Sequence, residues 1–281
     1  MSRYLVLGAT GLLGGELARR APADQEMIAL TSGELDIRNR DDVFKALDNM
    51  TPDLVINCAG YAGVDDAERE VEKAFLVNAY GARYVAEACS RSGATVVYFS
   101  TDYVFDGRKA GQPYVEGDNP APLNTYGLSK LTGEFFVRNA SPNYYIVRTA
   151  SLFGKPGTGG RGAGFVQRVL EAARKGDRFT AVTDLVMSPT YTADLADFAW
   201  KMLKERPECG IYHMVNEGWC SWHDLACAVV KEAGLDAEIA PVMHADLQGR
   251  ARRPLWSPLS TDRGYHMRPW NEALKEFLSS K

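Results

Sequence analysis

The stretch that decides the fold is Tyr4-Leu5-Val6-Leu7-Gly8-Ala9-Thr10-Gly11-Leu12-Leu13-Gly14. Its four leading apolar residues predict a short buried strand, and we expect a helix from Gly15 to Arg20. Glycines between a strand and a helix let the backbone approach a pyrophosphate, whose charge the free N–H groups of the helix N-terminus bind. The spacing Gly8, Gly11, Gly14 therefore indicates a dinucleotide site, although an ordinary strand-to-helix turn can also carry three glycines.

The composition is that of an ordinary globular protein. The 281 residues are 46% hydrophobic and 24% charged, with a net charge of −4, which suits one large domain or two unequal ones. This charge favours neither nucleic acid nor a membrane surface as a partner. No apolar stretch approaches the roughly 18 residues that span a bilayer. A strand follows Met-Ser-Arg at once, so we expect no signal peptide and a cytoplasmic location.

The five cysteines are scattered and odd in number, which argues against a disulfide framework. Cys220, His223 and Cys227 are close in sequence, but no fourth ligand is near and they fall in an amphipathic helical pattern. We therefore expect buried thiols there rather than a metal site.

Strands alternate with helices through the first half of the chain. We expect strands at 27–30, 54–57, 95–99 and 145–147, and helices at 41–49, 64–92 and 128–138. This alternation predicts an α/β fold with a doubly wound parallel sheet of the Rossmann type, whose ligand lies at the carboxyl ends of the strands.

The second half is less regular. We expect helices at 165–175, 192–205, 221–233 and 271–279, the third of them capped by Ser221. The glycine-rich segment Gly154 to Gly164, which includes Arg161, is a candidate mobile substrate loop. We assign residues 1–150 and about 180–200 to a cofactor domain. A smaller α/β substrate domain takes about 151–179 and 201–281, with part of 245–262 returning to the larger domain.

The strongest chemical signal is Tyr126-Gly127-Leu128-Ser129-Lys130. Tyr126 and Lys130 are four apart at the start of a helix and so share a face. A free tyrosine has a pKa near ~10, and a neighbouring ammonium favours its phenolate and so eases proton transfer. Thr101, at the end of a predicted strand, would hold a carbonyl oxygen. Together these residues predict carbonyl reduction.

Two longer stretches narrow the prediction. They are Asn57-Cys58-Ala59-Gly60-Tyr61 with Val64-Asp65-Asp66-Ala67-Glu68, and Ser100-Thr101-Asp102-Tyr103-Val104-Phe105-Asp106-Gly107. Shorter ones follow at Pro113-Tyr114, Pro122-Leu123-Asn124, Arg148-Thr149, Ser188-Pro189-Thr190, Gly210-Ile211-Tyr212-His213 and Arg253-Pro254. Over essentially the whole chain the pattern resembles the dTDP-4-dehydrorhamnose reductases, a family of extended short-chain dehydrogenase/reductases.

The resemblance implies roles for individual residues. Tyr126 would donate the proton, Lys130 would bind the nicotinamide ribose and lower the tyrosine pKa, and Thr101 would position the substrate. Cofactor contacts are implied for Gly8, Thr10, Gly11, Leu12, Leu13, Gly14, Asp36, Ile37, Cys58, Ala59, Gly60, Tyr61, Asn78, Ser100, Tyr126 and Lys130. Substrate contacts are implied for Val64, Thr101, Asp102, Tyr103, Phe105, Tyr126, Phe153 and Arg253. Hydride would reduce the 4-keto group of a nucleotide-linked 6-deoxyhexose, such as the precursor of dTDP-L-rhamnose.

Single positions in the sequence indicate which cofactor is preferred and whether a metal is expected. An acid at the end of the second strand would repel a 2′-phosphate. The chain has Leu30-Thr31-Ser32-Gly33 there and no acid before Glu34, which favours NADPH and leaves NADH as an alternative. Glu16 matches a position that contributes to a metal at a dimer contact in some family members. The other acids are not evident, so we expect no metal, while a homodimer stays open.

Several side chains keep a second interpretation. Asp102 and Asp106 would equally serve as turn caps, and Arg253 would either bind the diphosphate through its guanidinium or belong to a solvated loop. Glu134 and His213 are expected to pack rather than react.

The sugar pocket departs from the family pattern. Arg148-Thr149 is followed by Ala150-Ser151-Leu152-Phe153, and Asp184 to Thr190 also differs. These departures leave reductase chemistry favoured but leave the exact sugar open. Two other functions are alternatives. One is a nucleotide-sugar epimerase or dehydratase, which Thr101-Asp102-Tyr103 disfavours. The other is a non-catalytic dinucleotide-binding subunit resembling the regulatory partner of methionine adenosyltransferase.

Overall fold

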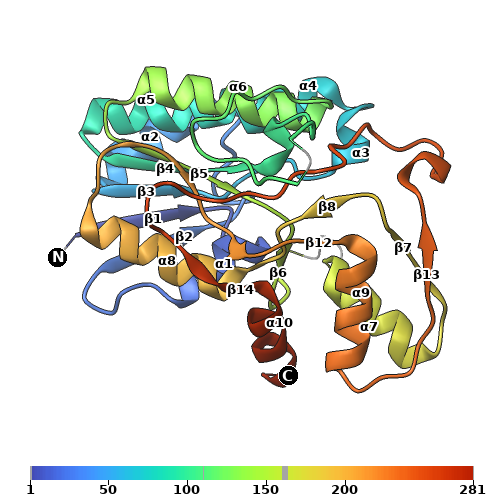
Figure 1. Ribbon diagram of the computed structural model, residues 1–281. Helices are drawn as coiled ribbons and strands as arrows, with labels where there is room; N and C mark the ends of the chain where they lie inside the picture. Colours follow the sequence, from blue (N-terminus) through green and yellow to red (C-terminus); the bar gives the residue numbers. More distant parts are fainter. Residues whose placement is uncertain (1, 110, 160–163, 281) are drawn as a thin grey trace.

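A six-stranded parallel sheet forms the centre of the molecule (Figure 1). The computed structural model describes residues 2–109, 111–159 and 164–280. The strands, in the order β10-β5-β4-β3-β1-β2, are β10 (Gly210–His213), β5 (Tyr144–Thr149), β4 (Thr95–Thr101), β3 (Leu54–Asn57), β1 (Arg3–Leu7) and β2 (Glu26–Leu30). All neighbours pair in parallel. The predicted doubly wound sheet is confirmed, and its chain order reverses between β1 and β3, where such folds bind ligands.

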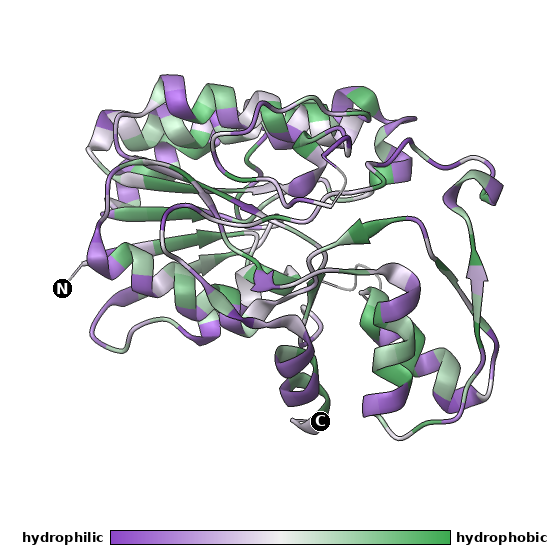
Figure 2. Ribbon diagram, viewed as in Figure 1, coloured by the Kyte–Doolittle hydropathy of each residue, from purple (hydrophilic) through white to green (hydrophobic). Residues whose placement is uncertain are grey.

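Helices cover both faces of this sheet (Figure 1). One face carries α2 (Arg40–Met50), α5 (Ala82–Ser92) and α6 (Thr125–Ala140), and the other carries α1 (Leu12–Arg19) and α8 (Thr192–Glu205). Successive strand residues point to opposite faces. In β1, Leu5 and Leu7 pack in the α2–α5 core, whereas Val6 packs with α1 and α8. Figure 2 shows the consequence, hydrophobic strands between striped helices.

A smaller lobe stands beside the sheet and has its own core. Its main elements are α7 (Phe165–Lys175), β7 (Phe179–Val182), α9 (Trp222–Glu232), β13 (Ile239–Val242) and α10 (Trp270–Ser279). Two-residue or three-residue strands join the lobes: β6 (Leu152–Phe153), β8 (Val186–Met187), β9 (Thr190–Tyr191), β11 (Asn216–Glu217), β12 (Cys220–Ser221) and β14 (Met267–Pro269). A short η3 (His244–Asp246) follows β13. Ser221 caps α9 as predicted, in a capping box with Asp224.

The boundary proposed between the lobes needs one correction. Residues 201–281 are not all in the smaller lobe, because β10 forms the edge of the central sheet. Met214, Tyr265 and Met267 pack in the same core as α8. The reason is that β5 offers an open edge, which a strand from the second half of the chain covers by pairing.

The helix predicted over 64–92 is wrong as a single element. The structure has α3 (Val64–Ala67), α4 (Val71–Phe75), a π-helical η1 (Leu76–Gly81) and then α5. The extra backbone step in η1 presents Asn78 to its neighbours, since its carbonyl accepts from the Tyr98 hydroxyl and its side chain binds Tyr61 and Ser129. A π-turn inside a helix often marks a functional site.

Two helices begin three residues earlier than predicted. Helix α1 begins at Leu12 with Gly11 as its N-cap, and α6 begins at Thr125, where the Asn124 side chain accepts the Gly127 N–H. Tyr126 therefore lies in the first turn of α6. Among the described residues, none of the helices combines the length and apolarity needed to cross a bilayer.

Candidate active site

The glycine turn between β1 and α1 is shaped as a cradle. Gly8 has a φ of +76°, and a Cβ there would lie 2.7 Å from the Ala59 nitrogen. A Cβ at Gly14 would collide with the Gly8 carbonyl. Side chains would fill the space that a pyrophosphate needs, and the N-terminus of α1 faces it with free N–H groups. The turn therefore fits a dinucleotide, as predicted; Leu13 packs in the core and has only its backbone to offer.

The second wall of the cradle is the segment after β3. Asn57 Oδ1 accepts the Ala59 N–H at 3.1 Å. Asn78 holds Tyr61 on both sides: its Oδ1 accepts the Tyr61 N–H at 2.8 Å, and its Nδ2 donates to the Tyr61 carbonyl at 3.0 Å. Asn78 is fully buried. Its contacts fix the wall, and the direct cofactor contact that the sequence suggested stays a prediction.

The segment after β2 carries Asp36 and Ile37, for which the resemblance implied cofactor contacts. Glu34 Oε2 accepts the Thr31 N–H at 2.8 Å, so this carboxylate caps its own turn. Asp36 pairs with the exposed Arg38, whose hydrogen bonds hold the Asp36 pKa below its usual value. Ile37 is buried against Gly81.

Thr101, Tyr126 and Lys130 come together at the carboxyl end of β4. Tyr126 and Thr101 share a hydrogen bond, and Thr101 Oγ1 donates to Asp102 Oδ1 at 3.0 Å. Lys130 is only 6% exposed. The structure therefore brings Thr101 and Tyr126 into contact, with the buried Lys130 four residues further along α6.

Burial sets the charges of this cluster. It raises the pKa of Tyr126 to about 12, with the Asp102 charge adding to the effect and the Thr101 hydrogen bond opposing it. It lowers the pKa of Lys130 to about 7, against the charges of Glu134 and Cys58. It also raises the pKa of Asp102 to about 6, although Ser257 and Thr101 donate to this carboxyl. Tyr126 thus holds a proton to give, and Lys130, four residues along the same helix, titrates near neutrality.

Residues 250–260, which we call the strap, cross this end of the sheet. Ser257 Oγ donates to Asp102 Oδ2 at 2.6 Å, and Asn124 Nδ2 donates to the Arg252 carbonyl. Arg253 pairs with Asp65 at 2.9 Å and contacts the Tyr103 phenol. The predicted substrate residues Asp102, Tyr103 and Arg253 are therefore brought together by the strap.

A buried ion pair lies below the catalytic cluster. Arg148 donates through Nε and Nη2 to both Glu134 oxygens, at 2.9 and 2.7 Å, and Ser100 Oγ donates to Glu134 Oε1. Both charged residues are less than 5% exposed. The Ser100 hydroxyl is thus turned into the protein. Sequence reasoning treated Glu134 as a packing acid and gave Arg148 no role; the signal available was the spacing of four from Lys130 to Glu134.

Two predicted substrate residues are placed elsewhere. Phe153 is 2% exposed and packs between Tyr191 and Phe277 in the core of the smaller lobe. Phe105 is fully buried and stacks on Tyr114 at 4.1 Å. Both expectations are corrected, because these rings are used up in apolar packing and offer no surface to a sugar.

The described part of the glycine-rich loop lies on the cofactor side. The Gly159 N–H donates to the Thr10 carbonyl at 3.1 Å, and a Cβ at Gly157 would lie 2.8 Å from the Gly11 carbonyl carbon. These residues therefore pack on the glycine turn rather than on the predicted substrate pocket. Arg161 lies outside the described residues.

The cysteines and histidines take structural positions. Cys220 is buried, but Cys227 is exposed, 3.8 Å from His223 Nδ1, so the expectation of buried thiols holds only for the first. Glu16 pairs with Arg19 and Arg20. Across residues 2–109, 111–159 and 164–280, no three His, Cys, Asp or Glu side chains are arranged to hold a metal ion.

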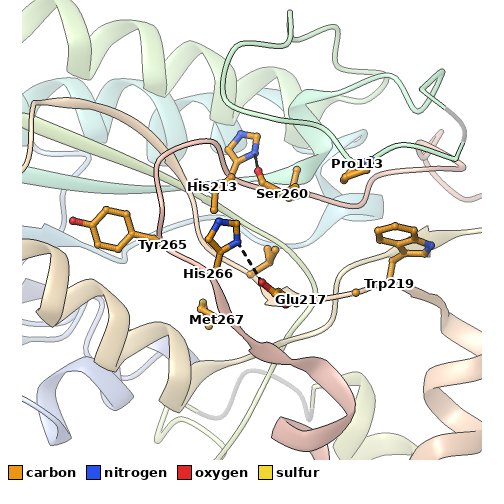
Figure 3. A pocket seen from close by; sticks show the side chains of 12 residues that line it. Pro113, His213, Glu217, Trp219, Ser260, Tyr265, His266 and Met267 are labelled. Atoms are coloured by element: carbon orange, nitrogen blue, oxygen red, sulfur yellow. Dashed lines mark hydrogen bonds and ion pairs between the residues drawn. The ribbon is translucent and has the colours of Figure 1, made fainter.

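A cavity of about 300 Å³ lies apart from this cluster (Figure 3). His213, Glu217, Trp219 and His266 are among its lining residues, and His266 pairs with Glu217 at 3.2 Å. None of Thr101, Tyr126 and Lys130 lines it. It is therefore separate from the catalytic groups.

Comparisons with known proteins agree with this geometry. The family model described as "RmlD substrate binding domain" matches residues 2–281. The spore coat polysaccharide biosynthesis protein SpsK of Bacillus subtilis is 39% identical over 100% of this chain and 98% of that protein. The dTDP-4-dehydrorhamnose reductase of Aggregatibacter actinomycetemcomitans is 38% identical over 98% of each. A probable dTDP-4,6-dihydroxy-2-methyloxan-3-one 4-ketoreductase of Streptomyces antibioticus is 37% identical over 98% of this chain and 94% of its own.

Solved structures extend the match to the fold. The crystal structure of dTDP-4-dehydrorhamnose reductase from Bacillus anthracis, in complex with NADP, has a TM-score of 0.94 at 35% identity and covers 100% of both chains. UDP-glucose 4-epimerase from Thermus thermophilus, with a TM-score of 0.82 at 20% identity, shares the fold alone.

A glycine cradle after β1 and a Tyr–Lys pair on the helix beside the end of β4 define an NAD(P)H-dependent reductase of the extended short-chain dehydrogenase/reductase class. Within that class, the chain belongs to the dTDP-4-dehydrorhamnose reductase family, which its full-length matches show. The non-catalytic alternative is therefore set aside.

Proposed function

We propose that the protein reduces the 4-keto group of dTDP-4-dehydro-L-rhamnose to give dTDP-L-rhamnose, with NADPH as its cofactor. The observation that carries the proposal is the cluster of Thr101, Tyr126 and Lys130 at the edge of the glycine cradle. Support for NADPH comes from the absence of an acid before Glu34 and from the NADP in the similar Bacillus anthracis structure.

NADPH, when bound, supplies the hydride. The chain's own residues supply the rest. To bind the carbonyl oxygen, the Thr101 hydroxyl turns from Asp102, to which it donates in the free protein. The Tyr126 hydroxyl gives its proton to that oxygen as negative charge develops. Lys130 stabilises the resulting phenolate, which burial alone disfavours. Until the carbonyl oxygen binds, the Asp102 carboxylate accepts the Thr101 hydroxyl and keeps its oxygen beside Tyr126.

A related 4-keto deoxysugar is the second candidate substrate. The Streptomyces antibioticus relative has nearly the same identity as the rhamnose-type reductases but a different sugar in its name. Phe153, the first aromatic residue after the Arg148-Thr149 pair, is buried in the core, so the sugar pocket of this chain differs from the family pattern.

The proposal is tested by NADPH oxidation with dTDP-4-dehydro-L-rhamnose, comparing the wild type with Tyr126→Phe. Loss of the general acid should lower kcat by about 10²- to 10⁴-fold. Asn139→Ala is the control, because Asn139 is exposed at the far end of the same helix, and this variant should retain turnover. Cofactor binding without turnover of this sugar, but with turnover of another 4-keto sugar, would move the assignment to the second candidate.

We further propose that two copies of the chain form a dimer through α4, η1 and α6, the last of which carries Tyr126. Val71, Leu76 and Tyr80, on α4 and η1, and Leu128 and Phe135, on α6, are each more than 40% exposed. An apolar face of this kind favours association. Light scattering of wild type and Phe135→Glu tests it: a dimeric wild type and a monomeric variant are expected, and a monomeric wild type would contradict it.

The cytoplasm remains the proposed location, which cell fractionation would test.

A further inference from the structure

Asp65 binds the strap at three points. Its Oδ1 accepts the Ala251 N–H at 2.9 Å and lies 2.9 Å from Arg253 Nη1, while its Oδ2 accepts Arg250 Nη1 at 2.6 Å. Asp65 lies in α3, which follows the wall of the cofactor cradle. One carboxylate therefore connects that wall to the strap. It holds the strap backbone at Ala251 and the side chain of Arg253 in place.

The charges around this carboxylate do not balance. Asp65 faces two guanidinium groups, those of Arg250 and Arg253, whereas its neighbour Asp66 pairs with Arg69. One positive charge is left over beside Asp65. The Arg253 side chain is 15% exposed, so this charge is held mostly out of water, where its attraction for an anion is strengthened.

The surplus charge lies next to the catalytic group. Arg253 contacts the Tyr103 phenol, and the Tyr103 ring meets the Tyr126 ring edge-on at 6.1 Å between centroids. Arg253 Nη1 is occupied by Asp65 and by the Ala251 carbonyl, at 3.1 Å. With Nη1 fixed, the guanidinium plane is oriented and its other N–H groups can face a ligand.

An open cavity of about 470 Å³ borders the same contacts. Gly63, Val64, Asp65, Asp66, Gln248 and Arg250 are among the residues that line it. The cavity therefore borders the contact of Asp65 with Arg250.

We propose that Asp65 is a positioning residue that presents the Arg253 guanidinium to the diphosphate of the nucleotide-sugar substrate. The inference rests on the proposed function, because it takes the diphosphate as the anion. Asp65 acts through Arg253 and does not contact the reacting atoms. It supplies binding energy for the nucleotide part of the substrate, which appears in KM rather than in the hydride step.

The test uses thymidine diphosphate, whose binding to the NADPH-loaded protein is measured by calorimetry without turnover. Asp65→Asn keeps the side-chain volume and an oxygen for the Ala251 N–H but removes the charge that orients Arg253. Its affinity for thymidine diphosphate should fall about tenfold, as for loss of one charge-assisted contact. KM for the nucleotide sugar should rise by the same factor, while kcat stays within about threefold of wild type.

Asp66→Asn is the matched control, because it removes a carboxylate from the same turn whose partner is Arg69 and not the strap. It should bind thymidine diphosphate like wild type. In an Arg253→Met background, Asp65→Asn should cost little further affinity, because the residue through which it acts is gone. The inference would be overturned if the double variant lost the sum of the affinities that Asp65→Asn and Arg253→Met lose singly. Wild-type affinity in Asp65→Asn alone would also overturn it.

Two results separate this inference from the function on which it rests. A wild type that binds NADPH but not thymidine diphosphate would contradict the proposed substrate class and with it the role of Asp65. A wild type that binds both, with an unaltered Asp65→Asn, would contradict the role of Asp65 alone. If that variant does not fold, Asp65→Glu keeps the charge on a longer arm; it must also weaken thymidine diphosphate binding, and equal affinity would overturn the inference.

Discussion

Lys130 Nζ lies 4.1 Å from the centroid of the Tyr98 ring. The ammonium that we propose assists Tyr126 therefore lies on an aromatic face, in a site where burial lowers its pKa to about 7. A ring face attracts a desolvated cation by about 2 kcal/mol, which offsets part of the cost of burying the charge. Tyr98 is held in place because its hydroxyl donates to the Asn78 carbonyl at 2.8 Å.

The first prediction concerns pH. Lys130 is charged below its pKa of about 7 and neutral above it, so its help to Tyr126 is present at low pH and lost as the pH rises. We expect kcat/KM for NADPH, which reports the free enzyme, to fall as the pH rises through about 7. Removing the ring by Tyr98→Leu should move this midpoint down by about one unit.

Tyr98→Phe is the control for this prediction, because it keeps the ring and loses only the hydroxyl. Its midpoint should stay at that of the wild type. A profile that is flat across neutrality in the wild type would show that Lys130 does not titrate there.

The second prediction concerns the buried ion pair. Glu134→Gln leaves the Arg148 guanidinium, 2% exposed, without its carboxylate. Breaking such a pair should lower the free energy of unfolding by about 3–5 kcal/mol. The double variant Glu134→Gln with Arg148→Met removes the unpaired charge and should lose less, as measured by urea denaturation. A double variant less stable than Glu134→Gln would contradict the argument.

The third prediction concerns cofactor choice. Thr31→Asp places a carboxylate directly after β2, where it would repel a 2′-phosphate and accept a ribose hydroxyl. We expect the ratio of kcat/KM for NADPH to that for NADH to fall by about tenfold or more, the equivalent of about 1.4 kcal/mol. Glu34→Gln removes the nearest acid and should move the ratio the opposite way. If both variants changed this ratio by the same factor in the same direction, the segment would not face the ribose.

The fourth prediction concerns the segment packed on the glycine turn. Gly157→Ala adds a Cβ that collides with the Thr10 carbonyl, so the segment must move away from the cofactor cradle. Overpacking of this kind costs about 1–3 kcal/mol, and we expect NADPH to dissociate about three- to tenfold faster in stopped-flow measurements. Gly164→Ala, whose Cβ would have only the Leu152 carbonyl at 4.0 Å, is the control. Unchanged or slower release from Gly157→Ala would show that the segment does not cover the bound cofactor.

The sequence by itself determined the class of fold and predicted the trio Thr101, Tyr126 and Lys130. Gly8 and Gly14 could be identified from the sequence because a turn with no room for a Cβ admits only glycine. Tyr126 and Lys130 could be paired from the sequence because residues four apart on a helix lie on the same face, whatever tertiary contacts form later. The helices 165–175 and 192–205 were predicted with the bounds that the structure gives, since their apolar periodicity is regular.

The tertiary structure decided what depends on contacts between distant segments. The break of 64–92 into three helices and a π-turn follows from partners far along the chain, among them Tyr98 and Ser129. Phe153 was expected in the sugar pocket and lies in a core, because its ring stacks on Tyr191 from another strand. Asp65 and Arg253 meet across more than half the chain. Local sequence carries no signal for such pairs, whose attraction exists only once the fold has brought the strap across the carboxyl ends of the strands.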